Sequence, residues 1–145
     1  MKTVLVTGGT RGIGLSTALK FIEEGWNVYI TSRKQENLDA VLEDHSNLKG
    51  FVARADDLSA ATETCKTIVS DTGSLDALIN NAGTNPSGGS LLDVELSAVQ
   101  KTWDVNLMGP LMWTREAVKA GLKESVLNVC SVGGIKPAHY MGAYN

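Results

Sequence analysis

Short apolar, β-branched runs alternate with helical stretches along the whole of this 145-residue chain. The runs predict strands at residues 3–6, 28–31, 51–53, 75–80 and 126–130. Between them, apolar residues recur every three or four positions, which indicates helices. Continuously apolar strands separated by helices are typical of a parallel sheet that helices cover on both faces. The order of elements therefore predicts a doubly wound α/β fold that forms one domain over residues 1–145.

The longest expected helical region runs from Ser97 to about Lys123 and follows a Gly/Pro/Ser-rich loop through Gly89. Pro110 stands inside this region. Proline has no amide hydrogen to donate and clashes with the preceding turn of a helix. We therefore expect Pro110 to bend or divide the helix.

Charge and composition exclude several classes of protein. A net charge of -3 gives no basic surface that would attract nucleic acid or anionic lipid. No apolar run approaches the ~20 residues that span a membrane. Cys65 and Cys130 form no spaced disulfide or metal pattern, and His45 and His139 are isolated. We expect a cytoplasmic protein without a metal site, whose partner is a small molecule rather than nucleic acid or a membrane.

Three glycines occupy the turn between the first expected strand and the first expected helix. Gly8, Gly12 and Gly14 let the backbone turn tightly and approach a pyrophosphate, while the helix N-terminus offers free N–H groups. The spacing is G-x-x-x-G-x-G and not G-x-G-x-x-G, so the match lies in the strand–turn–helix context. Such a turn can also serve only as a connection. The alternating elements around it favour a Rossmann-like dinucleotide-binding domain.

The end of the second strand indicates which dinucleotide binds. An acid about 20 residues beyond the glycines holds the ribose 2′-hydroxyl of NAD. Here the segment reads Thr31-Ser32-Arg33-Lys34 and has no carboxylate. Arg33 can bind a 2′-phosphate through two hydrogen bonds, Ser32 can donate another, and Arg11 adds positive charge. These residues predict NADP(H) as the cofactor, with a merely solvated basic loop as the alternative.

Polar residues also occur at positions where the expected strands and helices would have apolar ones. Asn80-Asn81-Ala82-Gly83 closes the fourth strand although asparagine is a poor strand former, so either a binding role or an Asx turn explains it. Asn106 interrupts an apolar helical face and needs hydrogen-bond partners there, in a functional role or at a structural kink. Asp57 begins the helix after the third strand, where it suits an N-cap.

Ser131 and Tyr144 lie thirteen positions apart, on either side of a loop with Gly133, Gly134 and Pro137. This loop comes immediately after the fifth strand. A serine can donate a hydrogen bond to a carbonyl oxygen, and a tyrosine can protonate the alkoxide that forms when the carbonyl is reduced. The pair has meaning only in combination with the motifs upstream.

Together these motifs resemble the short-chain dehydrogenase/reductase family, and the resemblance covers the whole chain. It is carried by Thr7-Gly8-Gly9-Thr10-Arg11-Gly12-Ile13-Gly14, Asn81-Ala82-Gly83, Asn106, Ser131 and Tyr144. It implies an NADPH-dependent oxidoreductase that reduces a ketone or aldehyde to an alcohol by hydride transfer. The substrate is then a 3-oxoacyl thioester or a general carbonyl compound.

The resemblance also implies a role for each matching residue. Tyr144 is the general acid, Ser131 binds the carbonyl oxygen, and Asn106 holds a water of the proton relay. An acid followed by Val or Leu lies beside the adenine in the family, and Asp57-Leu58 matches it. The implied cofactor-binding residues are Gly8, Thr10, Arg11, Gly12, Ile13, Gly14, Ser32, Arg33, Asp57, Leu58, Asn81, Ala82 and Gly83.

The family's catalytic lysine stands four positions after the tyrosine, which would be position 148 here. We therefore expect the chain to be a C-terminally incomplete piece of a longer protein, with its fifth strand a bare sheet edge. A dinucleotide-binding fragment without catalysis remains the alternative function. The complete protein is expected to be a homo-oligomer, because family members commonly build oligomer contacts on the long helix that carries Trp103, Met108, Met112 and Trp113.

Overall fold

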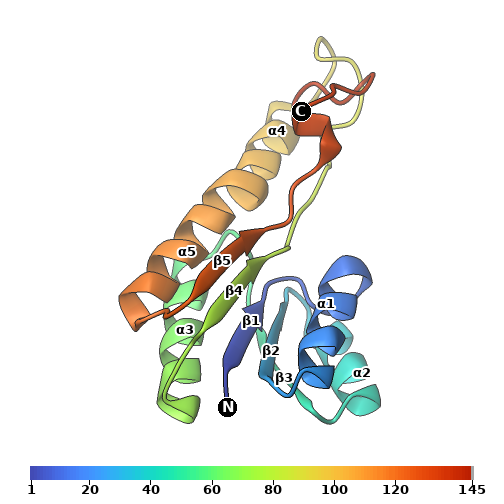
Figure 1. The fold of residues 1–145 in the computed structure, drawn as a ribbon. Coiled ribbons are helices and arrows are strands. Elements are labelled where there is room, and N and C mark those ends of the chain that lie inside the picture. The colour runs from blue at the N-terminus through green and yellow to red at the C-terminus, as the bar shows by residue number, and fades with distance from the viewer. Residues whose placement is uncertain (145) are drawn as a thin grey trace.

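The computed structural model describes residues 1–144, which fold around a five-stranded parallel sheet of order β3-β2-β1-β4-β5 (Figure 1). The strands are β1(Thr3–Val6), β2(Asn27–Ser32), β3(Leu48–Val52), β4(Ala77–Asn80) and β5(Ser125–Asn128). The main helices are α1(Gly12–Glu23), α2(Gln35–Asp44), α3(Leu58–Thr72), α4(Leu96–Trp103) and α5(Gly109–Ala120). The predicted doubly wound α/β fold is confirmed.

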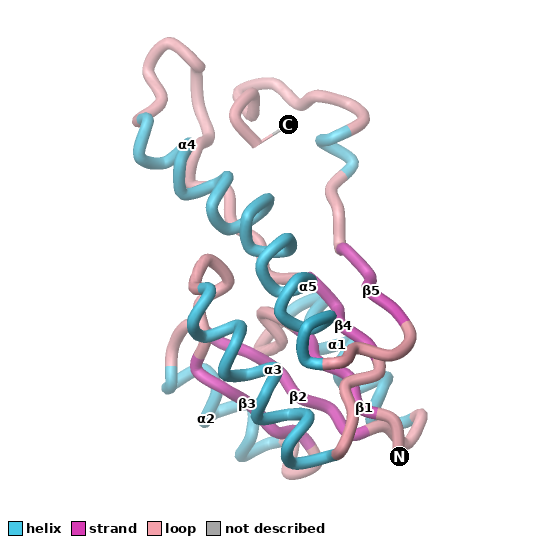
Figure 2. Tube along the Cα trace, turned by 90° about the vertical axis from the view of Figure 1, so that its left-hand side faces the viewer, coloured by secondary structure: helices cyan, strands magenta, loops and turns pink. Residues whose placement is uncertain are grey.

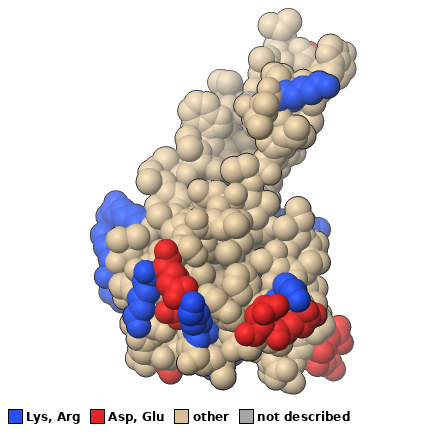
Figure 3. Space-filling model, in the orientation of Figure 1, with Lys and Arg blue, Asp and Glu red and all other residues tan. Residues whose placement is uncertain are grey.

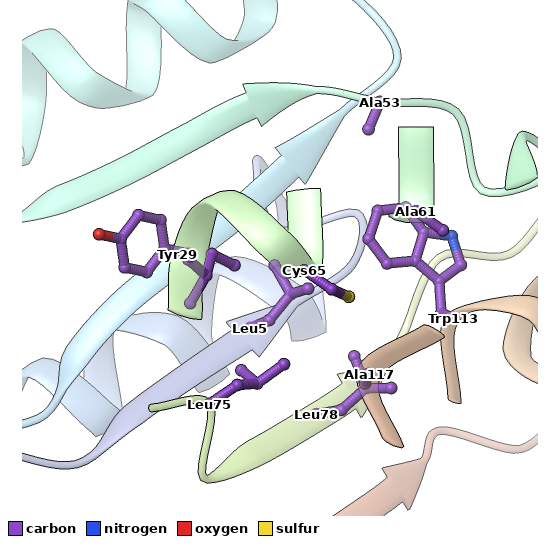
Figure 4. Packing of buried hydrophobic residues seen from close by; sticks show 10 residues of the cluster. Leu5, Tyr29, Ala53, Ala61, Cys65, Leu75, Leu78, Trp113 and Ala117 are labelled. Carbon is purple, nitrogen blue, oxygen red and sulfur yellow. The ribbon is translucent and has the colours of Figure 1, made fainter. Parts of the chain in front are cut away.

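Alternate residues of the buried strands face opposite sides of the sheet, so the chain has two apolar cores. Val4 and Val6 of β1 face the side on which α1 and α2 pack. Leu5 faces the other side, where Cys65 of α3 and the fully buried Trp113 of α5 cover it (Figure 4). A sheet buried on both faces is expected to have continuously apolar strands, which explains why the strands could be read from short hydrophobic runs.

The order of strands reverses direction between β1 and β4. The chain runs from β1 outward through β2 to β3, then returns to pair β4 with the opposite edge of β1. In open α/β sheets, ligands bind outside the carboxyl ends of the strands at such a point. The glycine turn after β1 and the residues after β4 both lie at this end of the sheet.

The long helical region is divided, but the division lies before Pro110. A π-helical segment, η1(Asp104–Met108), separates α4 from α5, and Pro110 then occupies the first turn of α5. Proline is tolerated there because the first N–H groups of a helix have no partner within it. The three segments form one long rod that rises above the sheet in Figure 1.

The bounds of four strands also differ from the predicted ones, with β2 longer by one residue at each end. β3 begins at Leu48 and not at residue 51, and it includes Gly50. A Cβ on Gly50 would lie 2.4 Å from Cδ1 of Leu38, so the glycine permits close packing of α2. β4 begins two residues later than predicted, and β5 runs from Ser125 to Asn128 instead of 126–130.

β5 lies at the edge of the sheet, as predicted, and within residues 1–144 it pairs with β4 alone. All four of its residues are exposed. After a short 3-10 turn, η2(Val132–Gly134), the chain crosses to the loop before α4, where the Gly89 N–H donates to the Tyr140 carbonyl at 2.8 Å (Figure 2). This upper part of the molecule carries few charges on the face in Figure 3, and Leu92, Val132 and Ile135 are exposed in it.

No helix in the described part of the chain combines the length and the apolar character that crossing a membrane requires.

Candidate active site

The glycine turn after β1 has a backbone that side chains would disturb. Gly8 and Gly12 have φ of 65° and 54°, in the left-handed region that favours glycine. A Cβ on Gly14 would lie 2.4 Å from Nδ2 of Asn81 and 2.5 Å from the Gly8 carbonyl oxygen. The Arg11 side chain makes no capping hydrogen bond, and α1 has no acidic residue in its first turn. The N-terminus of α1 therefore presents N–H groups and partial positive charge without an internal anion.

Thr7 and Asn81 hold this turn against the end of β4. The buried Thr7 hydroxyl accepts hydrogen bonds from the N–H groups of Asn81 at 3.0 Å and Ala82 at 3.1 Å. It also donates to the Ile79 carbonyl at 3.3 Å. The Asn81 amide donates in return to the carbonyls of Thr7 and Gly8, both at 3.0 Å. Asn81 thus braces the glycine turn.

The end of β2 supports the turn from the other side. The Gly8 N–H donates to Oγ1 of Thr31 at 3.2 Å, and the Gly9 N–H donates to the Thr31 carbonyl at 3.1 Å. Ser32 is buried, and its hydroxyl bonds to the backbone of Lys34. Arg33 is exposed and forms no ion pair with any residue of 1–144. Its guanidinium group is therefore available to a ligand.

A cleft of about 590 Å³ opens between these segments. Most of the residues proposed from sequence to bind the cofactor line it: Gly8, Thr10, Arg11, Gly12, Ile13, Ser32, Arg33, Asn81, Ala82 and Gly83. Gly14, Asp57 and Leu58 do not line it. The cleft thus joins the ends of β1, β2 and β4 to the segment 53–56 after β3 and to Lys101 and Val105.

Sequence reasoning missed an ion cluster at the wall of the cleft. Asp56 accepts two hydrogen bonds from Arg54, at 3.1 and 2.9 Å, and also pairs with Lys101 of α4. Burial alone would raise the pKa of Asp56, but the hydrogen bonds from Arg54 and Lys101 outweigh it and lower the pKa to about 2. The opposite charges of Arg54 and Asp56, two residues apart, were a signal of this ion pair in the sequence. The pairing of Asp56 with Lys101 depends on the tertiary fold.

Asp57 is the N-cap of α3, which was the alternative to the adenine contact. Its carboxylate accepts a hydrogen bond from the N–H of Ala60 at 3.0 Å. Leu58, the first residue of the helix, is 41% exposed. The geometry satisfies an orphan N–H of the helix, and an adenine contact by this pair remains a prediction.

Asn106 lies in the π-helical segment and joins it to the loop after β4. Its side-chain oxygen accepts from the Thr84 N–H at 2.8 Å, and its amide donates to the Thr84 carbonyl at 2.7 Å. Thr84 lines the cleft, and so does Val105, the residue before Asn106. Asn106 thus lies behind one wall of the cleft, with its side-chain hydrogen bonds directed to backbone atoms.

Neither residue of the proposed catalytic pair lines the cleft. Ser131 is exposed, and its hydroxyl oxygen accepts from the Gly133 N–H at 3.1 Å. Tyr144 is half-buried, and its N–H donates to the Met141 carbonyl at 3.0 Å. Over residues 1–144, no cluster of three His, Cys, Asp or Glu side chains is suited to hold a metal ion.

The geometry of the cleft agrees with comparisons to known proteins. A family model described as short chain dehydrogenase matches residues 2–145. Tropinone reductase-like 3 of Erythroxylum coca is 31% identical over 99% of this chain and 57% of its own. A variant of actinorhodin polyketide ketoreductase solved with NADPH matches with a TM-score of 0.93 at 27% identity, over 99% of this chain and 58% of that one.

An NAD+-bound xylitol dehydrogenase matches nearly as well, with a TM-score of 0.90 at 27% identity, over 99% of this chain and 58% of that one. The chain spans a little over half the length of these proteins. The family match nevertheless extends over nearly all of the chain, from the glycine turn through the residues after β5. The chain belongs to the short-chain dehydrogenase family.

Proposed function

We propose that this chain carries the cofactor site of an NADPH-dependent reductase that converts a ketone or aldehyde to an alcohol. The NADPH-bound ketoreductase and the NAD+-bound xylitol dehydrogenase show that family membership alone does not select the cofactor. The observation that carries the proposal is Arg33, whose guanidinium lies beside Ser32 at the cleft and has no ion pair among residues 1–144, with no acid in the segment 31–34. A carboxylate there would repel a 2′-phosphate, whereas arginine binds it through two hydrogen bonds.

The residues present fit a pyrophosphate and a phosphorylated ribose. The uncapped N-terminus of α1 and the left-handed glycines offer backbone N–H groups at the cleft. Arg11 and Arg33 add two positive charges that no carboxylate of residues 1–144 neutralises. When bound, NADPH supplies the hydride for reduction of the carbonyl carbon.

In this proposal the chain's own residues handle the carbonyl oxygen and its proton. Ser131 donates a hydrogen bond to the oxygen, and Tyr144 donates the proton that the developing alkoxide takes up. Asn106, whose side chain is hydrogen-bonded to the backbone of Thr84, holds a water of the proton relay. The substrate is a 3-oxoacyl thioester or a general carbonyl compound, in a homo-oligomeric protein of the cytoplasm.

Replacing Arg33 by Ala tests the cofactor choice. We expect NADPH affinity to fall roughly 10- to 100-fold, because a charged hydrogen-bond pair is worth about 1.5–3 kcal/mol, and NADH affinity to change little. Isothermal titration calorimetry with both cofactors measures this. Lys66→Ala is the matched control, since it removes one positive charge from the exposed face of α3. Equal weakening of NADPH and NADH by Arg33→Ala would contradict the proposal.

A second candidate function is dinucleotide binding without turnover. Ser131 is exposed, and neither Ser131 nor Tyr144 lines the cleft. These two observations favour binding without turnover for residues 1–144 taken alone. Oxidation of NADPH with a panel of ketones and aldehydes separates the two. Turnover that Tyr144→Phe abolishes supports the reductase, whereas tight NADPH binding with no turnover supports the binding module.

A further inference from the structure

Two arginines leave neighbouring strands at the same edge of the sheet. β2 and β3 pair in parallel, with Ser32 opposite Val52, and the Ala53 N–H donates to the Ser32 carbonyl at 2.8 Å. Arg33 follows Ser32 directly, and Arg54 follows Ala53. Both line the cleft. The strand register therefore places Arg33 and Arg54 side by side, on the same wall of the cleft.

Asp56 holds one of these arginines in a defined orientation. The Arg54 guanidinium donates through Nε to Oδ1 and through Nη2 to Oδ2, so the two planar groups meet along a shared edge. The Asp56 side chain is only 14% exposed, whereas that of Arg54 is 59% exposed. A guanidinium fixed in this way loses less conformational freedom when it binds a further anion. Arg54 thus combines a fixed orientation with an accessible charge.

The charges around this carboxylate do not balance. Lys101 pairs with Asp56 as well, so two cations share one anion. Glu116 is similarly shared by Arg115 and Lys119, but none of those three lines the cleft. At the cleft the surplus adds to Arg11 and Arg33, and Asp56 is the sole acidic side chain among the lining residues. A polyanionic ligand is what this wall would attract.

We propose that Arg54, oriented by Asp56, is a second specificity-determining residue for the 2′-phosphate of NADP(H), beside Arg33. The inference rests on the proposed cofactor choice and adds a residue that follows β3 to the one that follows β2. It assigns Asp56 a positioning role, because its carboxylate directs the Arg54 guanidinium and carries no surplus negative charge toward the ligand.

The test compares two ligands that differ only in the 2′-phosphate, adenosine 2′,5′-bisphosphate and adenosine 5′-monophosphate. Binding of each to the 145-residue chain is measured by calorimetry for wild type, Arg54→Met and Arg54→Lys. We expect Arg54→Met to lose about tenfold in affinity for the bisphosphate and less than twofold for the monophosphate. Arg54→Lys should recover part of the loss, because it keeps the charge without the planar fork. Lys66→Met is the control for lost net charge.

The outcomes distinguish a failure of the Arg54 inference from a failure of the proposed NADP(H) choice. If wild type does not prefer the bisphosphate, the proposed NADP(H) choice fails, and the role of Arg54 fails with it. If wild type prefers the bisphosphate and Arg54→Met keeps that preference, Arg54 has no role while Arg33 retains its own. A similar loss for both ligands in Arg54→Met would assign Arg54 to the structure of the cleft rather than to recognition, and would also overturn the inference. Circular dichroism verifies that each variant is folded.

Discussion

The carboxyl end of β1, β2 and β4 differs sharply from the segment that follows β5. At the first, Thr7 is buried and its hydroxyl makes three hydrogen bonds that join the glycine turn to the end of β4. At the second, β5 is exposed along its whole length, and the Ser131 hydroxyl accepts a hydrogen bond from the N–H of Gly133, two residues along the chain. Within residues 1–144, the glycine turn at the cleft is held by hydrogen bonds to the ends of both β4 and β2. The proposed catalytic residues have no comparable support among residues 1–144.

The difference follows from the order of the sheet. β1 is its central strand, with β2 on one side and β4 on the other, so the turn after it is hydrogen-bonded to the ends of both neighbours. Within residues 1–144, β5 pairs with β4 alone, and its other edge is free. A preorganised binding site needs support from a second layer of residues, which the end of β1 has among residues 1–144.

Gly14→Ala should produce the largest effect, because it adds a side chain at a closely packed point of the supported region. The new Cβ would fall 2.4 Å from the Asn81 amide and 2.5 Å from the Gly8 carbonyl, which must move apart. Overpacking of this kind costs about 1–3 kcal/mol, and here it also displaces the phosphate turn. We expect NADPH affinity to fall on the order of 100-fold, measured by titration of NADPH fluorescence.

Gly88→Ala is the control for this change. A Cβ on Gly88 would meet no heavy atom within 4 Å, and the backbone of Gly88 does not have a positive φ. The substitution should leave both folding and NADPH binding unchanged. If Gly14→Ala binds NADPH as wild type does, the turn is not the tightly braced element that the hydrogen bonds indicate.

The contrast between the two regions also explains what the sequence could predict. The glycine turn, Ser32, Arg33 and Asn81 are local patterns at strand ends, and the parallel fold brings them to one edge without further information. The ion cluster of Arg54, Asp56 and Lys101 could not be predicted, because Asp56 and Lys101 are 45 residues apart and meet only through the packing of α4.

The division of the long helix shows a second limit. Pro110 was the expected helix breaker, yet the π-helical segment lies at Asn106, for which a structural kink was one of the two readings, and the Asn106 side chain is hydrogen-bonded to the backbone of Thr84. Close packing adds to this, since a Cβ on Gly109 would lie 2.9 Å from the Ala55 carbonyl oxygen. Such backbone adjustments depend on tertiary contacts, which intrinsic helix propensities do not describe.

Thr7→Val should have an intermediate effect, and it tests how much the hydrogen bonds of Thr7 contribute to the free energy of unfolding. The substitution keeps the shape of the side chain but leaves the N–H groups of Asn81 and Ala82 without their acceptor. An unsatisfied buried group costs about 1–3 kcal/mol, so we expect a loss of about 2–3 kcal/mol in the free energy of unfolding. Urea denaturation measures it. Thr7→Ser keeps the hydroxyl and should recover most of the stability; equal losses in both variants would point to packing of the methyl group instead.

Ser131→Ala and Tyr144→Phe should have the smallest effect, and they test the other side of the comparison. Neither residue lines the cleft, and neither hydroxyl is hydrogen-bonded to the glycine turn within residues 1–144. The NADPH affinity of this chain should therefore change less than about twofold in either variant, by the same fluorescence titration. A tenfold loss in either one would mean that the segment after β5 closes over the cofactor, and the two regions would then form one site whose parts assemble only when the ligand binds.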